Sequence, residues 1–325
     1  MIIVTGGAGF IGSALVSKLN DAGREDILIV DSMGEGPKWK NLAKLRFSRL
    51  IHKDEIWSWL EEIGQYETVE AVFHMGACSS TTVMDVDFLT SNNINYSIEL
   101  WNWCSAFEVP MIYASSAATY GDGSHGFADD EATHRKSVPL NPYGFSKHRF
   151  DEWVLQQKKA PPFWAGMKFF NVYGPNEYHK GKQTSVIYQL LPQVQESGEI
   201  KLFRSDHKDY ADGGQQRDFV YVKDCVDFMM HLYTARPESG LYNCGTGKAR
   251  SFNDLAKAIF KAMNLTEAKI SYIDMPKALV GQYQYFTEAG QKSIKDSGYD
   301  KEFTSIEDGV EDYVNKYLLA EDKYL

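Results

Sequence analysis

The sequence predicts an α/β protein built on a doubly wound parallel sheet, with a smaller α/β lobe for substrate binding. Two observations lead to this prediction. The chain opens with a strand, a glycine-rich turn and a helical pattern, and buried strand-like runs then alternate with helical patterns. The 325 residues suffice for one large α/β unit and a second lobe. We expect residues 1–170 to form the sheet domain, with the chain returning to it at about 218–248, and residues 171–325 to form mainly the substrate lobe.

The first twelve residues predict a dinucleotide site of the Rossmann type. An apolar run at residues 2–4 stops at a glycine cluster, in which Gly7, Gly9 and Gly12 satisfy G-x-G-x-x-G. Gly6 provides the alternative spacing G-x-x-G-x-x-G. Such a turn lets backbone N–H groups approach a pyrophosphate, and it places the anion at the positive end of the following helix.

The second strand supports the same interpretation and leaves the cofactor open. Residues 27–30 form an apolar run that ends at Asp31, about twenty residues after the glycines, where a carboxylate can bind a ribose hydroxyl. Asp31 favours the free 2'-hydroxyl of NAD, whereas Lys38 or Lys40 can pair with the 2'-phosphate of NADP. The residues alone therefore do not choose between NAD and NADP.

A helix is predicted over 54–64 and a strand over 69–74, followed by a loop of small residues at 75–80. This loop follows the carboxyl end of a strand, so we expect it to line the cofactor cleft. His74 and Cys78 have residue types that are common in catalysis. A lone histidine at a strand end and a lone cysteine in such a loop are more often packing residues, and we favour packing for both.

The middle of the chain predicts a helix over about 88–107, a strand that opens at residues 111–113, and a helix that begins after Pro142. On that last helix Tyr143 and Lys147 are four residues apart and share a face. A tyrosine is a weak base at its usual pKa of about 10, but a neighbouring ammonium favours the phenolate. Ser116, at the end of the preceding strand, can position a substrate oxygen while Tyr143 takes its proton.

Composition narrows the function classes. The formal net charge is −10, which argues against a general nucleic-acid-binding or membrane-surface protein. The four cysteines are scattered without C-x-x-C pairing, so we expect neither a disulfide framework nor a metal site. We find no signal peptide and no run of about 20 apolar residues that could span a bilayer. These observations predict a soluble, cytoplasmic protein.

Three motifs carry a family resemblance. The glycine turn at 6–12, Ser115-Ser116-Ala117-Ala118-Thr119-Tyr120-Gly121 and Tyr143-Gly144-Phe145-Ser146-Lys147 resemble the extended short-chain dehydrogenase/reductases that act on nucleotide sugars, in the NAD-dependent epimerase/dehydratase family. The 4,6-dehydratases of that group carry an Asp-Glu pair where this chain has Ala117-Ala118, which disfavours water elimination. The resemblance implies a Rossmann fold, a nicotinamide cofactor and a nucleotide-sugar substrate.

Further motifs narrow the resemblance to one branch of the family. Segments 76–82, 170–175, 179–181, 217–222, 245–247 and 281–284 are similar to the ADP-L-glycero-D-manno-heptose 6-epimerases. The resemblance to this branch implies an enzyme that inverts C6'' of ADP-D-glycero-β-D-manno-heptose. The implied mechanism is NADP-mediated oxidation to a ketone and re-reduction on the opposite face. The product supplies heptose for the lipopolysaccharide core. The resemblance also implies a homo-oligomer, possibly a pentamer. The alternatives are another epimerase or reductase of the family, such as a UDP-sugar 4-epimerase, and a catalytically silent NAD(P)-binding regulator.

The resemblance also implies roles for individual residues. Tyr143, Lys180, Ser116 and Lys147 are the implied catalytic residues, with Lys180 as a second acid–base group; the alternative is that Lys180 is an ordinary surface lysine. The implied cofactor contacts are Gly6, Gly9, Phe10, Ile11, Gly12, Asp31, Ser32, Lys38, Lys53, Met75, Gly76, Ala77, Cys78, Ser79, Asn92, Lys147, Val172 and Lys180. The implied substrate contacts are Asn171, Lys182, Gln189, Phe203, Arg204, Ser205, Asp206, Arg217 and Tyr283.

Beyond residue 173 the elements are shorter. We predict helices over 185–191, 224–233, 251–263 and 305–319, with Ser251 as an N-cap, and a short strand at 201–203. The chain departs from the branch pattern in two places. Residues 207–216 resemble an insertion before Arg217, and Gln282 stands where an arginine is expected. Both departures concern recognition of the substrate diphosphate.

Overall fold

The computed structural model describes residues 1–62, 68–275 and 284–325. Its centre is a seven-stranded sheet in which every neighbouring pair is parallel, as the doubly wound prediction requires. In sheet order the strands are β11 (Gly240–Cys244), β6 (Trp164–Phe169), β5 (Met111–Ser116), β4 (Ala71–His74), β1 (Ile2–Thr5), β2 (Ile27–Val30) and β3 (Arg49–Ile51).

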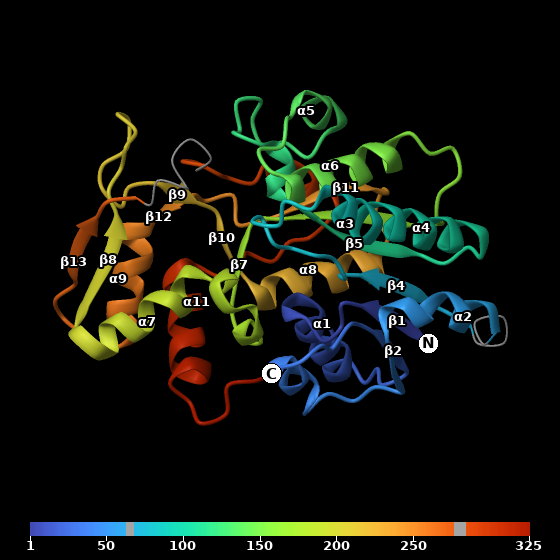
Figure 1. The fold of residues 1–325 in the computed structure, drawn as a ribbon, viewed down its shortest axis with the longest axis horizontal. Coiled ribbons are helices and arrows are strands. Elements are labelled where there is room, and N and C mark those ends of the chain that lie inside the picture. Colours follow the sequence, from blue (N-terminus) through green and yellow to red (C-terminus); the bar gives the residue numbers. More distant parts are fainter. Residues whose placement is uncertain (63–67, 276–283) are drawn as a thin grey trace.

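Helices cover both faces of this sheet (Figure 1). On one face lie α1 (Phe10–Asp21) and α8 (Val222–Ala235), which pack against each other. On the other face lie α2 (Ile56–Glu62), α4 (Tyr96–Ala106) and α6 (Pro142–Leu155). Successive strand residues alternate between the two cores, so that Ile2 packs toward α1 and Ile3 toward α4. Burial on both faces explains why these strands read as continuous apolar runs.

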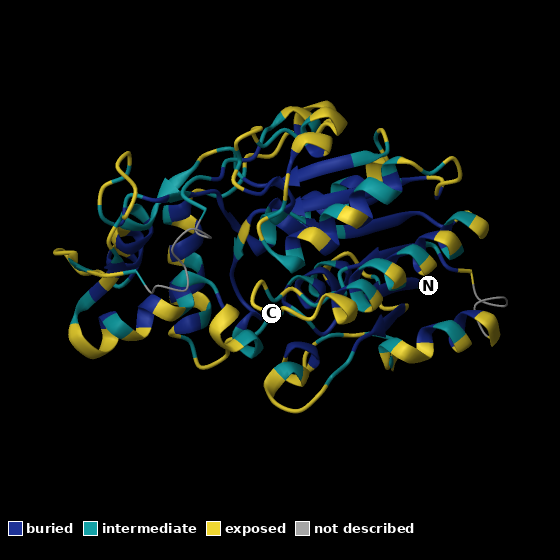
Figure 2. Ribbon diagram, turned by 45° about the horizontal axis from the view of Figure 1, so that its top comes forward, coloured by how far each residue is buried: buried dark blue, intermediate teal, exposed yellow. Residues whose placement is uncertain are grey.

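The smaller lobe is built from short paired strands and helices. Its strands pair as β7 (Asn171–Tyr173) with β10 (Phe219–Tyr221), β8 (Glu199–Phe203) with β13 (Lys269–Ile273), and β9 (Gln216–Arg217) with β12 (Arg250–Ser251). Its helices are α7 (Val186–Ser197), α9 (Phe252–Ala262), α11 (Ile306–Tyr313) and the π-helical turn η6 (Val314–Leu318). The short helix α10 (Lys292–Asp296) packs beside β11 of the central sheet. Figure 2 shows the central strands almost entirely buried, with exposed residues on the outer surfaces of the helices and in loops.

Short helices complete the connections. They are η1 (Pro37–Leu42), η2 (Lys53–Glu55), α3 (Val86–Leu89), η3 (Thr90–Asn95), η4 (Ala117–Tyr120), α5 (Glu131–Lys136) and η5 (Tyr178–Gln183). Among the residues that the structure describes, no helix is both long and apolar enough to cross a membrane.

Most predicted elements are confirmed, with changed boundaries. The helix predicted over 88–107 is interrupted by the π-helical turn η3, where the Asn93 side chain bonds the backbone N–H and C=O of Cys78, at 2.9 Å each, and so joins this turn to the loop after β4. The helix predicted over 54–64 is η2 followed by α2, and its last two residues lie outside the described residues. Ser251 and Ser305 are N-caps, as their residue type suggests.

Candidate active site

The glycine turn after β1 is shaped by close backbone contacts that only glycine allows. Gly6 has φ +66°, and an added Cβ there would lie 2.6 Å from the Gly76 nitrogen. An added Cβ at Gly12 would lie 2.1 Å from the Gly6 carbonyl oxygen. The first turn of α1 can therefore approach β1 and β4 closely and leave its N–H groups open to an anion. This cradle fits the pyrophosphate of a dinucleotide.

Two adjoining cavities extend from this turn. The larger, of about 880 Å³, runs from the glycine turn past the end of β5 to the start of α7. The predicted residues that line it are Gly6, Gly9, Phe10, Ile11, Gly12, Asp31, Lys38, Met75, Gly76, Ala77, Ser79, Ser116, Tyr143, Lys147, Asn171, Val172, Lys180 and Lys182. The smaller, of about 360 Å³, is lined by the predicted residues Gly6, Asp31, Ser32, Lys38, Lys53, Gly76, Ala77, Cys78 and Asn92. Every predicted cofactor contact thus faces one of the two cavities.

Asp31, at the end of β2, is buried and already has partners. One carboxylate oxygen accepts a hydrogen bond from the Ala8 N–H at 2.9 Å. The other pairs with Lys38, whose ammonium also donates to the Ser32 carbonyl oxygen at 3.0 Å. The Asp31 charge is therefore balanced by a lysine that itself lines both cavities.

Tyr143, Lys147 and Ser116 come together where α6 crosses the end of β5. The Lys147 ammonium is buried and donates to the Ala114 carbonyl oxygen at 2.8 Å. The Ser116 hydroxyl accepts from the Ala118 N–H at 3.1 Å and hydrogen-bonds the Tyr143 phenol. Asn141 caps α6 by accepting from the Gly144 N–H at 2.8 Å, which fixes the start of the helix that carries Tyr143 and Lys147.

The protonation of this pair differs from the sequence expectation. Burial raises the pKa of the Tyr143 phenol, although the Ser116 hydrogen bond opposes part of the effect. The expected lowering of this pKa is therefore not seen in this arrangement, because burial, which disfavours the phenolate, is the largest influence on it. Burial also lowers the pKa of Lys147 to about 8, against the opposing charge of Asp151. Tyr143 is thus a proton donor at neutral pH, and Lys147 can gain or lose a proton near the working range.

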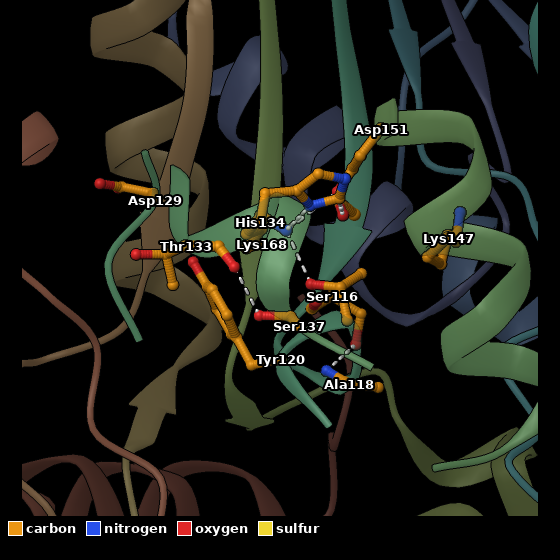
Figure 3. A network of polar contacts seen from close by, with 12 residues as sticks. Ser116, Ala118, Tyr120, Asp129, Thr133, His134, Ser137, Lys147, Asp151 and Lys168 are labelled. Atoms are coloured by element: carbon orange, nitrogen blue, oxygen red, sulfur yellow. Dashed lines mark hydrogen bonds and ion pairs between the residues drawn. The ribbon is translucent and has the colours of Figure 1, made fainter. Parts of the chain in front are cut away.

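Figure 3 shows a buried ionic network around Lys168 and Asp151, close to Ser116. The Lys168 ammonium contacts Asp151 at 3.0 Å and Thr119 at 2.7 Å. The Asp151 carboxylate also accepts from the hydroxyls of Ser115 at 2.6 Å and Tyr113 at 3.1 Å. Burial alone would raise the pKa of Asp151, but Lys168 and its hydrogen bonds hold it below its ordinary value. The network ties α6 to β5 and β6, directly beside the strand end that carries Ser116.

Lys180 also lines the larger cavity, from η5. Its ammonium lies 5.4 Å from the centre of the Phe10 ring, beside the start of α1. Burial lowers the pKa of Lys180, while the negative charge of Glu177 opposes the shift. The structure therefore does not place Lys180 on an open surface, and its ammonium can exchange a proton more readily than a solvated lysine.

The remaining predicted substrate residues are spread along the smaller lobe. Those that do not line the larger cavity, within the described residues, are Gln189, Phe203, Arg204, Ser205, Asp206 and Arg217. Gln189 donates to the Thr184 carbonyl oxygen at 2.7 Å. Arg204 is exposed and pairs with Asp274 at 3.2 Å, whereas Arg217 is buried with its guanidinium above the Phe252 ring. Tyr283 and Gln282 lie outside the described residues.

The structure also adds residues to the cleft that the sequence prediction missed. Additional lining residues include Thr81, Thr82, His179, Gln183, Thr184, Ser185, Val186, Ile187, Phe219 and Leu255 in the larger cavity, and Phe88 and Tyr96 in the smaller. Ser185 is recognisable from sequence as the N-cap before an apolar helical pattern. Leu255 and Phe219 have no such signal, because they reach the cavity only through packing of α9 and β10.

His74 and three of the four cysteines are buried, whereas Cys78 is only partly buried. His74 is buried, with its ring nitrogens 2.6 Å from the Thr5 hydroxyl and 2.9 Å from the Ser97 hydroxyl. Burial lowers its pKa to about 3, so it is neutral. Cys78 lines the smaller cavity, and the four cysteines are free thiols. No group of three or more potential metal-binding side chains occurs in the described part of the chain.

The doubly wound sheet, the glycine cradle and the Ser116–Tyr143–Lys147 arrangement define a nicotinamide-dependent enzyme of the short-chain dehydrogenase/reductase type. The NAD dependent epimerase/dehydratase family matches residues 2–245. The chain belongs to this family.

Similar proteins point to one branch. The chain is 52% identical to ADP-L-glycero-D-manno-heptose-6-epimerase of Nitratidesulfovibrio vulgaris strain DP4, over the full length of both. It is 50% identical to the protein of the same name from Fusobacterium nucleatum, again over all of both chains. The crystal structure of Helicobacter pylori ADP-L-glycero-D-manno-heptose-6-epimerase superposes with a TM-score of 0.80 at 27% identity, covering 97% of this chain and 95% of that one.

Proposed function

We propose that this protein inverts C6'' of ADP-D-glycero-β-D-manno-heptose to give the L-glycero epimer, and so supplies heptose for the lipopolysaccharide core. The observation that carries this proposal is the 52% identity to an ADP-L-glycero-D-manno-heptose-6-epimerase along the whole of both chains. The enzyme is then an isomerase. A cleft with acid–base groups on two sides is the arrangement that inversion of a hydroxyl-bearing carbon needs.

A bound nicotinamide supplies the hydride acceptor and donor for oxidation to a ketone and re-reduction. Tyr143 exchanges the hydroxyl proton on one side of the reacting carbon, and Ser116 hydrogen-bonds the same oxygen. Lys147 holds the nicotinamide ribose and carries charge beside Tyr143. Lys180 exchanges the proton on the other side of the reacting carbon. This role is supported by its place in the lining of the same cavity and by its position beside Phe10. Asn171 and Lys182 contact the sugar nucleotide in this proposal, which is supported by their place in the lining of the larger cavity.

We infer that NADP is the preferred cofactor. An unpaired carboxylate at the end of β2 would repel a 2'-phosphate, but the Asp31 charge is balanced by Lys38. Lys38 and Lys53 both line the smaller cavity, where each pairs with a carboxylate, Lys38 with Asp31 and Lys53 with Asp54 at 2.7 Å. Either ammonium group can also contact a 2'-phosphate there. We further propose that residues 1–170 and 218–248 hold the cofactor and that the rest of the chain mainly holds the substrate. In this proposal the protein works in the cytoplasm. It forms a homo-oligomer, possibly a pentamer.

The test uses purified protein and ADP-D-glycero-β-D-manno-heptose, with the epimers separated by anion-exchange chromatography. Formation of the L-glycero epimer is the expected result. A Tyr143→Phe variant should lose at least about 100-fold in kcat, since it removes the proton-exchanging hydroxyl. Unchanged starting material at micromolar wild-type enzyme, with turnover of a UDP-hexose instead, would favour a UDP-sugar 4-epimerase. The mass of the nucleotide released by heat denaturation distinguishes NADP from NAD.

A further inference from the structure

Lys180 lies in residues 176–185, a segment with little regular secondary structure to fix its position. It contains the short 3-10 helix η5, whose backbone leaves helical geometry at Gly181, which has φ +57°. Short 3-10 turns have weak internal hydrogen bonds, so their placement depends on contacts with other elements. Displacing a reacting group by about 1 Å can cost roughly 100-fold in rate. The contacts that fix residues 176–185 therefore matter for any chemistry at Lys180.

Glu177, just before η5, hydrogen-bonds Ser185 at the other end of residues 176–185. Its side chain is fully buried and accepts hydrogen bonds from the Ser185 hydroxyl at 2.6 Å and from the Ser185 N–H. The Tyr313 hydroxyl, from α11, donates to the same carboxylate at 2.8 Å. One carboxylate thus joins the two ends of the segment to each other and to a helix near the other end of the chain.

Asn176 fixes the segment to the cofactor-binding part of the molecule. It is fully buried and has φ +75°, a backbone conformation that asparagine tolerates better than most residues. Its side-chain amide donates to the Ser13 hydroxyl of α1 at 2.9 Å, and its backbone carbonyl accepts from Asn41 at 3.0 Å. Its side-chain oxygen accepts from the backbone N–H of Leu325 at 3.1 Å. Residues 322–325 therefore meet the segment at Asn176.

Residues 322–325 make further contacts on both sides. Figure 1 shows this last part of the chain running from α11 back to the N-terminal elements beside α1. The Tyr178 hydroxyl donates to the Lys323 carbonyl oxygen at 2.6 Å, and the Tyr324 ring meets the Tyr178 ring edge-on at 5.2 Å. Lys44, after η1, donates to the Tyr324 carbonyl oxygen at 2.6 Å and pairs with Asp322. Residues 322–325 thus contact both Lys44, which follows η1, and Tyr178, at the start of η5.

We propose that residues 322–325 form a strap that positions Lys180, acting through Asn176, Glu177 and Tyr178, an inference that rests on the proton-exchanging role proposed for Lys180. The strap holds η5 against α1 and η1, so that the Lys180 ammonium stays beside Phe10 and shielded from water. Asn176, Glu177 and Tyr178 are positioning residues. They act on the reaction through the place and the hydration of Lys180.

The test compares wild-type protein, a variant lacking residues 322–325, Tyr178→Phe, and Lys316→Ala as a control. Lys316 makes an exposed ion pair with Asp312 at 2.6 Å in the same C-terminal helical region but touches neither the strap nor η5. The deletion should lower kcat about 10- to 100-fold with KM nearly unchanged. Tyr178→Phe removes the hydroxyl that donates to the Lys323 carbonyl oxygen, so it should lower kcat by roughly fivefold, less than the deletion does. The control should match wild type.

Two further measurements separate positioning from a general loss of stability. Water that reaches Lys180 raises its pKa toward the ordinary value, so the limb of the pH–kcat profile that Lys180 governs should move to higher pH in the deletion variant. The limb governed by Tyr143 should stay in place. Amide hydrogen exchange should rise in residues 176–185 of the variant while the central sheet keeps its protection.

The outcomes are distinct. The proposal would be wrong if the deletion variant had the kcat, the pH profile and the amide exchange of the wild type. A uniform fall in stability with an unmoved pH profile would also overturn it, because the segment would then contribute only to folding. If wild-type protein leaves the ADP-heptose unchanged, the proposed function fails instead. The exchange of residues 176–185 still decides in that case whether the strap holds η5.

Discussion

Replacing Lys168 by methionine should lower the free energy of unfolding by about 3 kcal/mol. Lys168 and Asp151 form an ion pair at 3.0 Å in which both side chains are 0% exposed. Removing one member of such a pair commonly costs 3–5 kcal/mol, because the remaining charge stays buried without compensation. Asp151 keeps hydrogen bonds from Ser115 and Tyr113, each worth about 1 kcal/mol, which places the cost at the lower end of that range.

The reciprocal change, Asp151→Asn, should have a similar cost. The Lys168 ammonium would retain the Thr119 hydroxyl at 2.7 Å and the face of the Tyr120 ring, 4.7 Å from its centre. The double variant leaves no buried charge, so it should cost less than about 3 kcal/mol, rather than the roughly 6 kcal/mol that additive single effects give. The expected coupling energy between the two residues is therefore at least about 3 kcal/mol.

The assay is urea denaturation at pH 7, followed by tryptophan fluorescence, on the wild type, both single variants and the double variant. Lys316→Ala, which breaks an exposed pair, is the matched control and should stay within about 0.5 kcal/mol of wild type. Single-variant effects that add in the double variant to within about 0.5 kcal/mol would refute the reasoning, because the two charges would then not depend on each other.

Two other predictions follow from the site. Lys38→Ala exposes the Asp31 charge to a 2'-phosphate and removes a charge-assisted contact worth about 1.5–3 kcal/mol. The ratio of NADP to NAD in the released cofactor should therefore fall about 10- to 100-fold. An unchanged ratio, measured by mass spectrometry, would contradict the role of Lys38. Burial lowers the pKa of His74 to about 3. The unfolded chain therefore binds more protons than the folded one between about pH 3 and 6.5, and stability falls as pH drops through that window. From pH 7 to 5 the stability of wild type relative to His74→Gln should fall by roughly 2 kcal/mol, as measured by urea denaturation, and a pH-independent difference would argue against a buried neutral histidine.

Local sequence was enough to predict which residues of the glycine turn, the end of β2 and the start of α6 line the cavities. The glycine turn, Asp31 and the Tyr143–Lys147 spacing lie in short stretches whose conformation is set by strand and helix patterns and by glycine's freedom. Their residues line the cavities as predicted. The π-helical turn η3 was not predicted, because it accompanies contacts between Asn93 and a loop fifteen residues away.

The sequence alone therefore determined the fold class and the order of the central elements, because these depend on strand and helix patterns within one or two turns of chain. Only the tertiary structure decided the protonation of the site and the support of Lys180. Burial, which raises the pKa of Tyr143 and lowers those of Lys147 and Lys180, depends on every element packed around them. The contact of Asn176 with Leu325 joins residues 149 positions apart, and no local pattern encodes such a pairing.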